Sequence, residues 1–261
     1  MVELDLLKAN LRRLTLRRIE EIFEQEAKRA VKLKMSYTGY LSRLVEEEVL
    51  AKNERSVNAR ISKARFPFLK TLESFDFSFQ PSISEVLIKE LAGLSFLQKA
   101  ENIVLLGPAG VGKTHLAIGL GMKACAARKR VLFVSALALT DELMAGLVSR
   151  ELLHKLDILS RLDLLIIDEL GYLPMDKGRA NLFFQLVSRR YESGSMIITT
   201  NRAFNEWGQV FGDDVIAGAI LDRVLHHSHI IAIQGESYRI KDKKSKTIDG
   251  DSKSEYTNKD G

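Results

Sequence analysis

Residues 103–114 read IVLLGPAGVGKT, which is four apolar residues followed by a glycine-rich turn and a Lys-Thr pair. This is a complete Walker A pattern, in which a buried strand runs into a loop whose amide N–H groups surround phosphates. The helix that begins near Lys113 adds the positive end of its dipole. The stretch therefore predicts an α/β nucleotide-binding domain built around a P-loop.

The side chains of this loop have distinct predicted roles. Lys113 is expected to contact the β- and γ-phosphates, and the hydroxyl group of Thr114 is a predicted Mg²⁺ ligand. The alternative is a chance match, which we expect in roughly one sequence of this length per hundred. The predicted strand before the loop argues further against a chance match. The predicted ATP-binding residues are Gly107, Pro108, Ala109, Gly110, Val111, Gly112, Lys113, Thr114 and His115.

A second motif, LLIIDE at residues 164–169, gives independent support. Four apolar residues indicate a buried strand, and two carboxylates follow at its C-terminal end, as in Walker B. Asp168 is predicted to bind ATP together with Mg²⁺, and Glu169 is placed to activate the water that attacks the γ-phosphate. Adjacent acids after a strand also cap helices, but that alternative leaves the upstream Walker A loop unexplained.

Residues 196–201, MIITTN, predict another strand that ends in polar residues. Asn201 is then placed to orient the attacking water or the γ-phosphate, although an asparagine that merely ends a strand is the better interpretation of this residue alone. Alternating strands and helices predict a five-stranded, mostly parallel sheet. The predicted strands are residues 103–106, 131–134, 164–167, 196–199 and 230–233.

The N-terminal part is predicted to be helical and basic. Apolar residues recur at helical spacing from Leu4 to Leu33, Ser36 is placed to cap a second helix, and residues 56–64 predict a third. Residues 1–70 hold 16 Lys and Arg against 10 Asp and Glu. We therefore expect a basic helical domain at residues 1–66, an aromatic linker at 67–82, an ATPase domain at 83–241 and a disordered tail at 242–261.

Composition bounds the cellular setting and the kinds of partner. A net charge of +5 and a pI near 9.2 suit an anionic partner such as nucleic acid without establishing one. The single cysteine excludes an internal disulfide, and no run of about 18 apolar residues occurs, so we expect a cytoplasmic protein without a membrane partner. His226, His227 and His229 lie close in sequence, but their spacing alone indicates no convergent ligand set. We therefore expect no metal besides Mg²⁺.

These motifs, in this order, resemble the AAA+ ATPases, and more specifically the IstB family of transposition helper ATPases. The DnaC-type helicase loaders share several of them. The resemblance covers about residues 1–241. The segments that carry it are KTLESFDFSFQP at 70–81, ELGYLP at 169–174, FFQLVSRRYE at 183–192, TTNRAFNEWGQVFGD at 199–213, AILDRVLHHSHII at 219–231 and GESYR at 235–239.

The resemblance implies an active site shared between subunits of a homo-oligomer. Asn201 matches the sensor 1 position, and Arg223 matches the arginine that a neighbouring subunit contributes. Arg239 is a candidate sensor 2 residue, although the sequence leaves no room for the helical lid domain that usually accompanies it. The resemblance also implies that the segment at residues 75–79 covers the adenine, while packing against the sheet explains those aromatic residues equally well.

The resemblance further implies assembly on duplex DNA and stimulation of a partner transposase in a bacterial cell. Without a base-reading motif, DNA binding should depend on phosphate contacts and show little sequence preference. A helicase loader of the DnaC type is the alternative, and a small-molecule phosphotransferase is a third, less favoured class. Basic residues predicted to contact DNA are Arg12, Arg13, Arg17, Arg18, Arg60, Lys63, Arg65, Arg150 and Lys155. From the residues alone, a solvated charged face is the better interpretation of these side chains.

Overall fold

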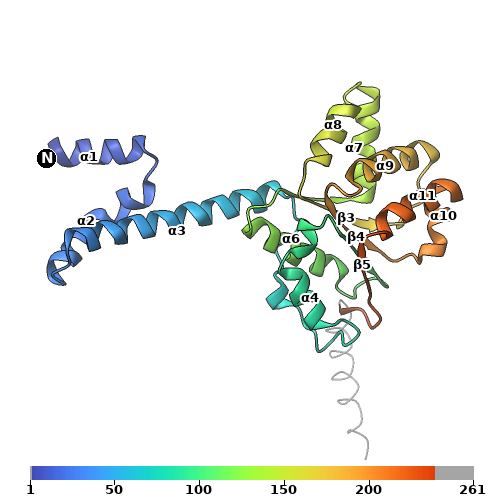
Figure 1. Cartoon of the computed structure of the whole chain (residues 1–261), viewed down its shortest axis with the longest axis horizontal. Helices are drawn as coiled ribbons and strands as arrows, with labels where there is room; N and C mark the ends of the chain where they lie inside the picture. Colours follow the sequence, from blue (N-terminus) through green and yellow to red (C-terminus); the bar gives the residue numbers. More distant parts are fainter. Residues whose placement is uncertain (1, 239–261) are drawn as a thin grey trace, which may run out of the picture. The chain divides into compact units, whose positions relative to one another are not determined.

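A computed structural model describes residues 2–238 of the chain (Figure 1). Contacts between residues divide the chain into two compact units, with the boundary between Ala59 and Arg60. The first unit holds α1 (Val2–Arg13), α2 (Arg17–Lys32) and most of α3 (Tyr37–Lys63). No helix in the described part of the chain is long and apolar enough to span a bilayer.

The first unit contains three helical segments with a small core of their own. The sequence predicts one helix from Leu4 to Leu33, and this prediction is wrong because the chain turns between α1 and α2. Thr15 adopts the left-handed conformation, with φ of 57°, and ends α1 without a glycine or proline to mark the break. Apolar spacing continues on both sides of the turn, so the pattern does not reveal it. The buried core residues are Leu11, Ile19, Phe23 and Leu44.

The helix α3 is continuous where two helices were expected. Its N-cap is correctly predicted, because the Ser36 hydroxyl accepts a 3.1 Å hydrogen bond from the Gly39 N–H. The polar residues near Ser56 do not interrupt it. The carboxylate of Glu48, buried on α3, accepts a 3.0 Å bond from the Ile19 N–H and pairs with Arg55 at 2.8 Å. An acid on one helix thus satisfies a free amide at the start of another.

A five-stranded parallel sheet in the order β2-β3-β4-β1-β5 forms the centre of the second unit. The expected α/β class and strand number are confirmed, and every pairing is parallel. Since the carboxyl ends of parallel strands share one edge, this order brings the loops after β1, β3 and β4 together. The strands are β1 (Asn102–Leu106), β2 (Val131–Ser135), β3 (Leu164–Leu170), β4 (Ser195–Thr200) and β5 (Ser228–Ala232).

Helices cover both faces of this sheet, as Figure 1 shows. Ile103 and Leu105 of β1 face the core under α6 and α4, whereas Val104 faces the core under α7 to α11. This alternation is typical of a strand buried on both faces. The helices are α4 (Glu85–Ala92), α5 (Ser95–Gln98), α6 (Lys113–Ala126), α7 (Ala136–Val148), α8 (Leu152–Ser160), α9 (Lys177–Arg190), α10 (Trp207–Phe211) and α11 (Asp214–Leu225).

Two irregular segments contact the P-loop: the aromatic segment, which precedes the sheet in sequence, and the chain that follows β5. The aromatic segment contains the short 3-10 helix η1 (Leu72–Ser74) and packs on the core under α6. After β5 the chain returns to the loop, where the Tyr238 N–H donates a 3.0 Å bond to the Gly110 carbonyl. No lid of helices follows β5 within residues 233–238. A second 3-10 helix, η2 (Phe204–Glu206), precedes α10.

Candidate nucleotide-binding site

The glycine-rich loop between β1 and α6 has the backbone geometry of a P-loop. Gly110 and Gly112 adopt φ values of 83° and 100°, which L side chains rarely adopt. A Cβ atom at Gly112 would lie 2.6 Å from the ring of Phe75, so both the turn and the packing of the aromatic segment require glycine here. Gly112 leads directly into α6, whose N-terminus presents the positive end of the helix dipole to an anion.

Lys113 folds back over this loop. Its Nζ atom donates hydrogen bonds of 2.7 Å to the carbonyl oxygens of Gly107 and Pro108. The ammonium group is therefore held beside the loop, where triphosphate oxygens would replace the two carbonyls as partners. This arrangement supplies the positive point charge that phosphate binding needs.

Asp168 is the most tightly held acid of the site. The residue is 8% exposed, and its carboxylate accepts hydrogen bonds from the Thr114 hydroxyl at 3.0 and 3.2 Å. Thr199 on the neighbouring strand donates a further bond of 2.6 Å. A carboxylate and a hydroxyl oxygen in contact fit Mg²⁺, which prefers oxygen ligands and keeps several of its waters. The Thr199 bond fixes which way the carboxylate faces.

Glu169 points away from the strand because the strand is irregular at this position. The register between β3 and β4 shifts between Ile167 and Leu170, and Glu169 adopts a left-handed φ of 59°. Its N–H donates a 2.9 Å bond to the same Thr199 hydroxyl that holds Asp168. The bulge thus re-aims an acidic side chain, which is exposed, toward the cavity beside the P-loop.

A cavity of about 750 Å³ lies over the P-loop, large enough for a nucleoside triphosphate. It collects loop, strand-end and aromatic residues from five segments of the chain. The lining residues are Phe68, Lys70, Ser74, Phe75, Asp76, Gln80, Ala109, Gly110, Val111, Gly112, Lys113, Thr114, His115, Glu169, Tyr172, Thr199, Thr200, Asn201 and Tyr238. The side chains of Asn201 and Glu169 therefore belong to one cavity.

His115 joins the P-loop helix to the aromatic segment. Its Nε2 atom lies 2.8 Å from the Thr71 carbonyl oxygen and 3.2 Å from Ser74 Oγ, and its ring packs edge-on against Phe75. Burial lowers the pKa of His115 below its ordinary value. The ring is thus a neutral hydrogen-bonding contact that holds Phe75 at the mouth of the cavity.

Comparison with known sequences places the chain in a family. A family described as IstB-like ATP binding protein matches residues 9–246. The chain belongs to this family. It is 48% identical over 226 residues to an ATP-binding protein of insertion sequence IS21 from Pseudomonas aeruginosa, covering 87% of this chain and 84% of the relative. It is 40% identical to the corresponding protein of insertion sequence IS232 from Bacillus thuringiensis subsp. berliner, covering 93% and 97%.

Solved structures show that this IstB-like chain has the P-loop AAA+ fold. AMPPCP-bound DnaA from Aquifex aeolicus superposes with a TM-score of 0.53 and 22% identity, covering 72% of this chain and 57% of DnaA. DnaI superposes with a TM-score of 0.52 and 22% identity, covering 63% of this chain and 91% of DnaI. At this identity the likeness shows the fold alone.

The resemblance implies roles in the ATPase site for two arginines, Arg223 and Arg239. Arg223 of the IstB-like chain is on α11, half-buried, and is not among the described residues that line the cavity. Its guanidinium lies 4.9 Å from the centre of the Phe184 ring and donates a 3.0 Å bond to the Ala219 carbonyl. Arg239 lies outside the described residues.

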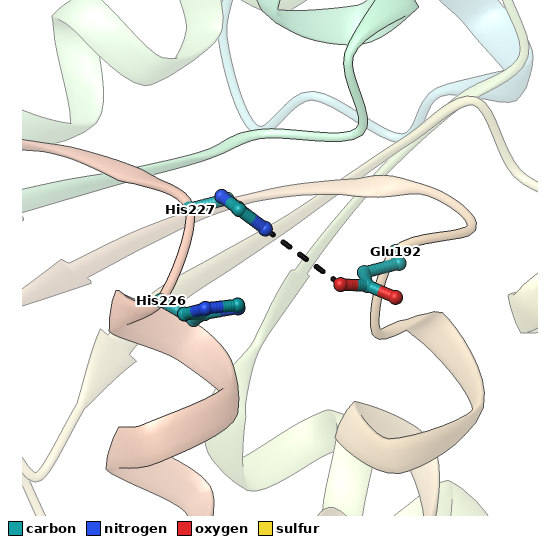
Figure 2. A group of neighbouring side chains, drawn as sticks. All are labelled: Glu192, His226 and His227. Carbon is teal, nitrogen blue, oxygen red and sulfur yellow. Dashed lines mark ion pairs between the residues drawn. The ribbon is translucent and has the colours of Figure 1, made fainter.

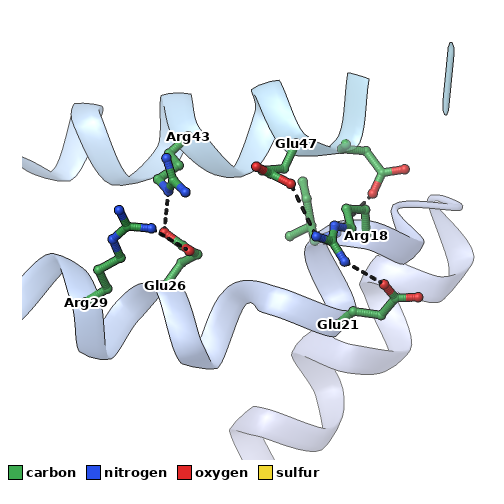
Figure 3. Close-up of polar contacts among 8 residues, drawn as sticks. Arg18, Glu21, Glu26, Arg29, Arg43 and Glu47 are labelled. Carbon is green, nitrogen blue, oxygen red and sulfur yellow. Dashed lines mark hydrogen bonds and ion pairs between the residues drawn. The ribbon is translucent and has the colours of Figure 1, made fainter. Parts of the chain in front are cut away.

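The basic residues of the first unit differ in whether acidic side chains already pair with them, and so in how available they are to bind phosphate. Arg12 pairs with Glu20 at 2.5 Å, and Arg18 lies between Glu21 and Glu47, at 3.3 and 3.4 Å (Figure 3). Arg13 and Arg17 are exposed, and no ion pair is recorded for either among residues 2–238. The second group of candidates is Arg60, Lys63, Arg65, Arg150 and Lys155, all within the second unit.

Some site residues were not found from the sequence. Thr199 and Tyr238 line the cavity although the sequence motifs assign them no role, whereas Phe75 belongs to the predicted aromatic segment. The available signal for Thr199 was its place beside Asn201 at the end of β4, opposite the Walker B strand. Thr199 lies beside the Walker B strand because β4 is next to β3 in the sheet, and no sequence motif encodes this strand order.

The bond from Thr199 gives a testable prediction for this IstB-like chain. Thr199→Val keeps the side-chain volume and removes the donor that holds Asp168, so we expect ATP affinity in the presence of Mg²⁺ to fall about 10- to 100-fold. Titration calorimetry with and without Mg²⁺ measures the ATP affinity of each variant. Thr140→Val is the matched control, because within residues 2–238 that buried hydroxyl donates only to carbonyls of its own helix. If Thr199→Val lost as much ATP affinity without Mg²⁺ as with it, the role of Thr199 in holding a Mg²⁺ ligand would be contradicted.

Proposed function

We propose that this IstB-like chain is a Mg²⁺-dependent ATPase that assembles with copies of itself on duplex DNA and stimulates a partner transposase. One observation carries the ATPase part: the P-loop lysine, the re-aimed Glu169 and Thr114, whose hydroxyl bonds to Asp168, line one cavity. Phosphate binding alone needs only the loop. The exposed acid beside the buried one favours hydrolysis.

The proposed reaction divides the work among these residues. Lys113 and the loop amides bind the β- and γ-phosphates, while Thr114 and Asp168 would hold Mg²⁺. Bound Mg²⁺ neutralises charge on the phosphate oxygens. Glu169 accepts a proton from the attacking water, and Asn201 orients that water. Thr199 keeps the carboxylate of Asp168 turned toward Thr114 rather than toward Glu169.

Arg223 supports a site that is completed by a neighbouring subunit. Contacts with Phe184 and Ala219 hold the guanidinium near the surface of α11, outside the cavity of its own chain. A positive group in that position stabilises charge on a γ-phosphate only if the phosphate belongs to another copy. The proposal therefore includes a homo-oligomer.

The relatives favour a role in transposition over helicase loading. Proteins that are 40–48% identical over most of their length are described as ATP-binding proteins of insertion sequences. The likeness to DnaI is weaker and concerns the fold. Pull-down of the purified chain against a replicative helicase and against the transposase of its own insertion sequence separates the two. Retention of the helicase alone would favour the loader.

The DNA-binding prediction rests on the exposed arginines of the first unit. Reversing Arg13 and Arg17 to glutamate is expected to weaken duplex binding and reduce the slope of log affinity against log salt by about two, because two phosphate contacts are lost. Fluorescence anisotropy with unrelated duplexes at several salt concentrations measures both quantities.

A charge-matched control makes that result interpretable. Lys89 and Lys99, with side chains 73% and 66% exposed on the second unit, are reversed in the same way. We expect this control to retain the wild-type slope. An unchanged slope in the Arg13 and Arg17 variant would place the DNA-binding surface elsewhere. Additional reversal of Arg12 and Arg18 tests whether ion-paired arginines also contribute.

A further inference from the structure

Two histidines and a glutamate from separate segments converge on the surface of the second unit (Figure 2). His226 is the C-cap of α11 and His227 follows it, while Glu192 follows α9. One nitrogen or carboxylate oxygen from each residue lies within 4.8 Å of the others, and all three side chains are exposed. The closest recorded pair is His227 Nε2 and Glu192 Oε1, at 3.6 Å.

The surrounding structure fixes this cluster in place. The carbonyl of His227 accepts a 2.8 Å bond from the Asn102 N–H at the start of β1, which anchors the backbone to the sheet. Nδ1 of His226 lies 2.7 Å from the hydroxyl group of Tyr191, and the two rings stack with centres 5.9 Å apart. With Nδ1 engaged, Nε2 is the nitrogen that remains for a ligand.

We propose that His226, His227 and Glu192 form a binding site for a divalent transition metal of the zinc type. Nitrogen and carboxylate ligands about 2.0–2.2 Å from a tetrahedral zinc lie about 3.3–3.6 Å from one another, which the His227–Glu192 separation already matches. Two histidines and one glutamate leave the fourth position to water, as solvent exposure requires. Tyr191 is a positioning residue that orients the His226 ring.

The third histidine of the sequence cluster is excluded from this site. His229 is on β5, where its Nε2 atom lies 3.1 Å from Glu101 Oε2. The three histidines that are neighbours in sequence therefore do not form one cluster. Glu192 replaces His229, and it is supplied by the turn between α9 and β4, which the histidine spacing does not indicate.

The site links the C-terminal ends of two helices. A metal bound to Glu192 and the two histidines would join the end of α9 to the end of α11, both of which pack on the same face of the sheet. Because a ligand that binds only the folded state stabilises it, metal should raise the thermal midpoint of unfolding. This property is separate from nucleotide binding and from the proposed function.

The test uses the full chain without a polyhistidine tag, freed of metal by a chelator and kept without nucleotide. Zn²⁺ is titrated in competition with a chromophoric chelator, with Mg²⁺ in excess to fill the P-loop site, and Co²⁺ replaces Zn²⁺ for absorption spectra. We expect one ion per chain and the intense visible absorption of tetrahedral Co²⁺. His227→Ala and Glu192→Gln should each weaken Zn²⁺ binding at least about tenfold, and Tyr191→Phe about tenfold.

Histidines outside the cluster provide the controls. His154→Ala and His229→Ala should bind Zn²⁺ as the wild type does. Circular dichroism of each variant without metal establishes that it is folded, and only the wild type and the controls should gain thermal stability from Zn²⁺. Failure of the wild type to bind one ion, octahedral Co²⁺, or unchanged affinity in His227→Ala would each overturn the proposal.

Discussion

Glu169→Gln is expected to reduce the rate of ATP hydrolysis about 10²- to 10⁴-fold. The amide keeps the size and position of the side chain at the bulge of β3 but cannot accept a proton from water. ATP affinity should stay near the wild-type value, because Lys113, Thr114 and Asp168 are unchanged. Steady-state phosphate release and equilibrium ATP binding measure the two properties separately.

Two comparisons make this result specific. Glu90→Gln, an exposed acid on α4, is expected to hydrolyse ATP at the wild-type rate. Asp168→Asn should lose ATP affinity in Mg²⁺ as well as turnover, since it removes a carboxylate that Thr114 and Thr199 hold. If Glu169→Gln turned over ATP normally, the water-activating group would have to be another residue.

Arg223→Ala should reduce hydrolysis by about 10³-fold, the size of effect that an arginine supplied by a neighbour can have. ATP binding to a single chain should change little, because Arg223 lies outside the cavity of its own chain. Phosphate release is measured over a range of protein concentrations. Arg189→Ala, an exposed arginine on α9, is the matched control.

Mixing inactive variants distinguishes a shared site from a local effect. Lys113→Ala subunits retain Arg223, and Arg223→Ala subunits retain an intact P-loop. Neither variant should be active alone. In a mixture, a Lys113→Ala subunit can supply its Arg223 to the intact P-loop of a neighbouring Arg223→Ala subunit, and hydrolysis should return at these interfaces. No recovery in any mixing ratio, together with weakened ATP binding by Arg223→Ala, would show that the arginine acts within its own chain.

The nucleotide site was largely predictable because its chemistry is encoded in contiguous motifs. A strand, three glycines and Lys113 with Thr114 specify the loop, and LLIIDE specifies the buried acid and its exposed neighbour. All five strands were predicted within a few residues because each is a short apolar run bounded by polar residues. The structure adds Thr199, whose hydroxyl contacts both acids of the Walker B strand.

Features that depend on tertiary contacts were not predictable in the same way. The break at Thr15 lies inside continuous apolar spacing, so helical periodicity alone joined α1 to α2. The ion pairs of Arg18 involve Glu47, which another helix supplies. Glu192 reaches the histidines at the end of α11 through the packing of two helices. In each case the missing information is which segments become neighbours.

ATP binding by the wild-type chain and by Lys113→Ala, measured at equilibrium in Mg²⁺ with a slowly hydrolysed analogue, tests the central claim most directly. A charged hydrogen-bond donor contributes about 1.5–3 kcal/mol, so the variant should bind about 10- to 150-fold more weakly than the wild type. Absence of binding by the wild type, or equal affinity of the two proteins, would contradict the assignment of this cavity to a triphosphate.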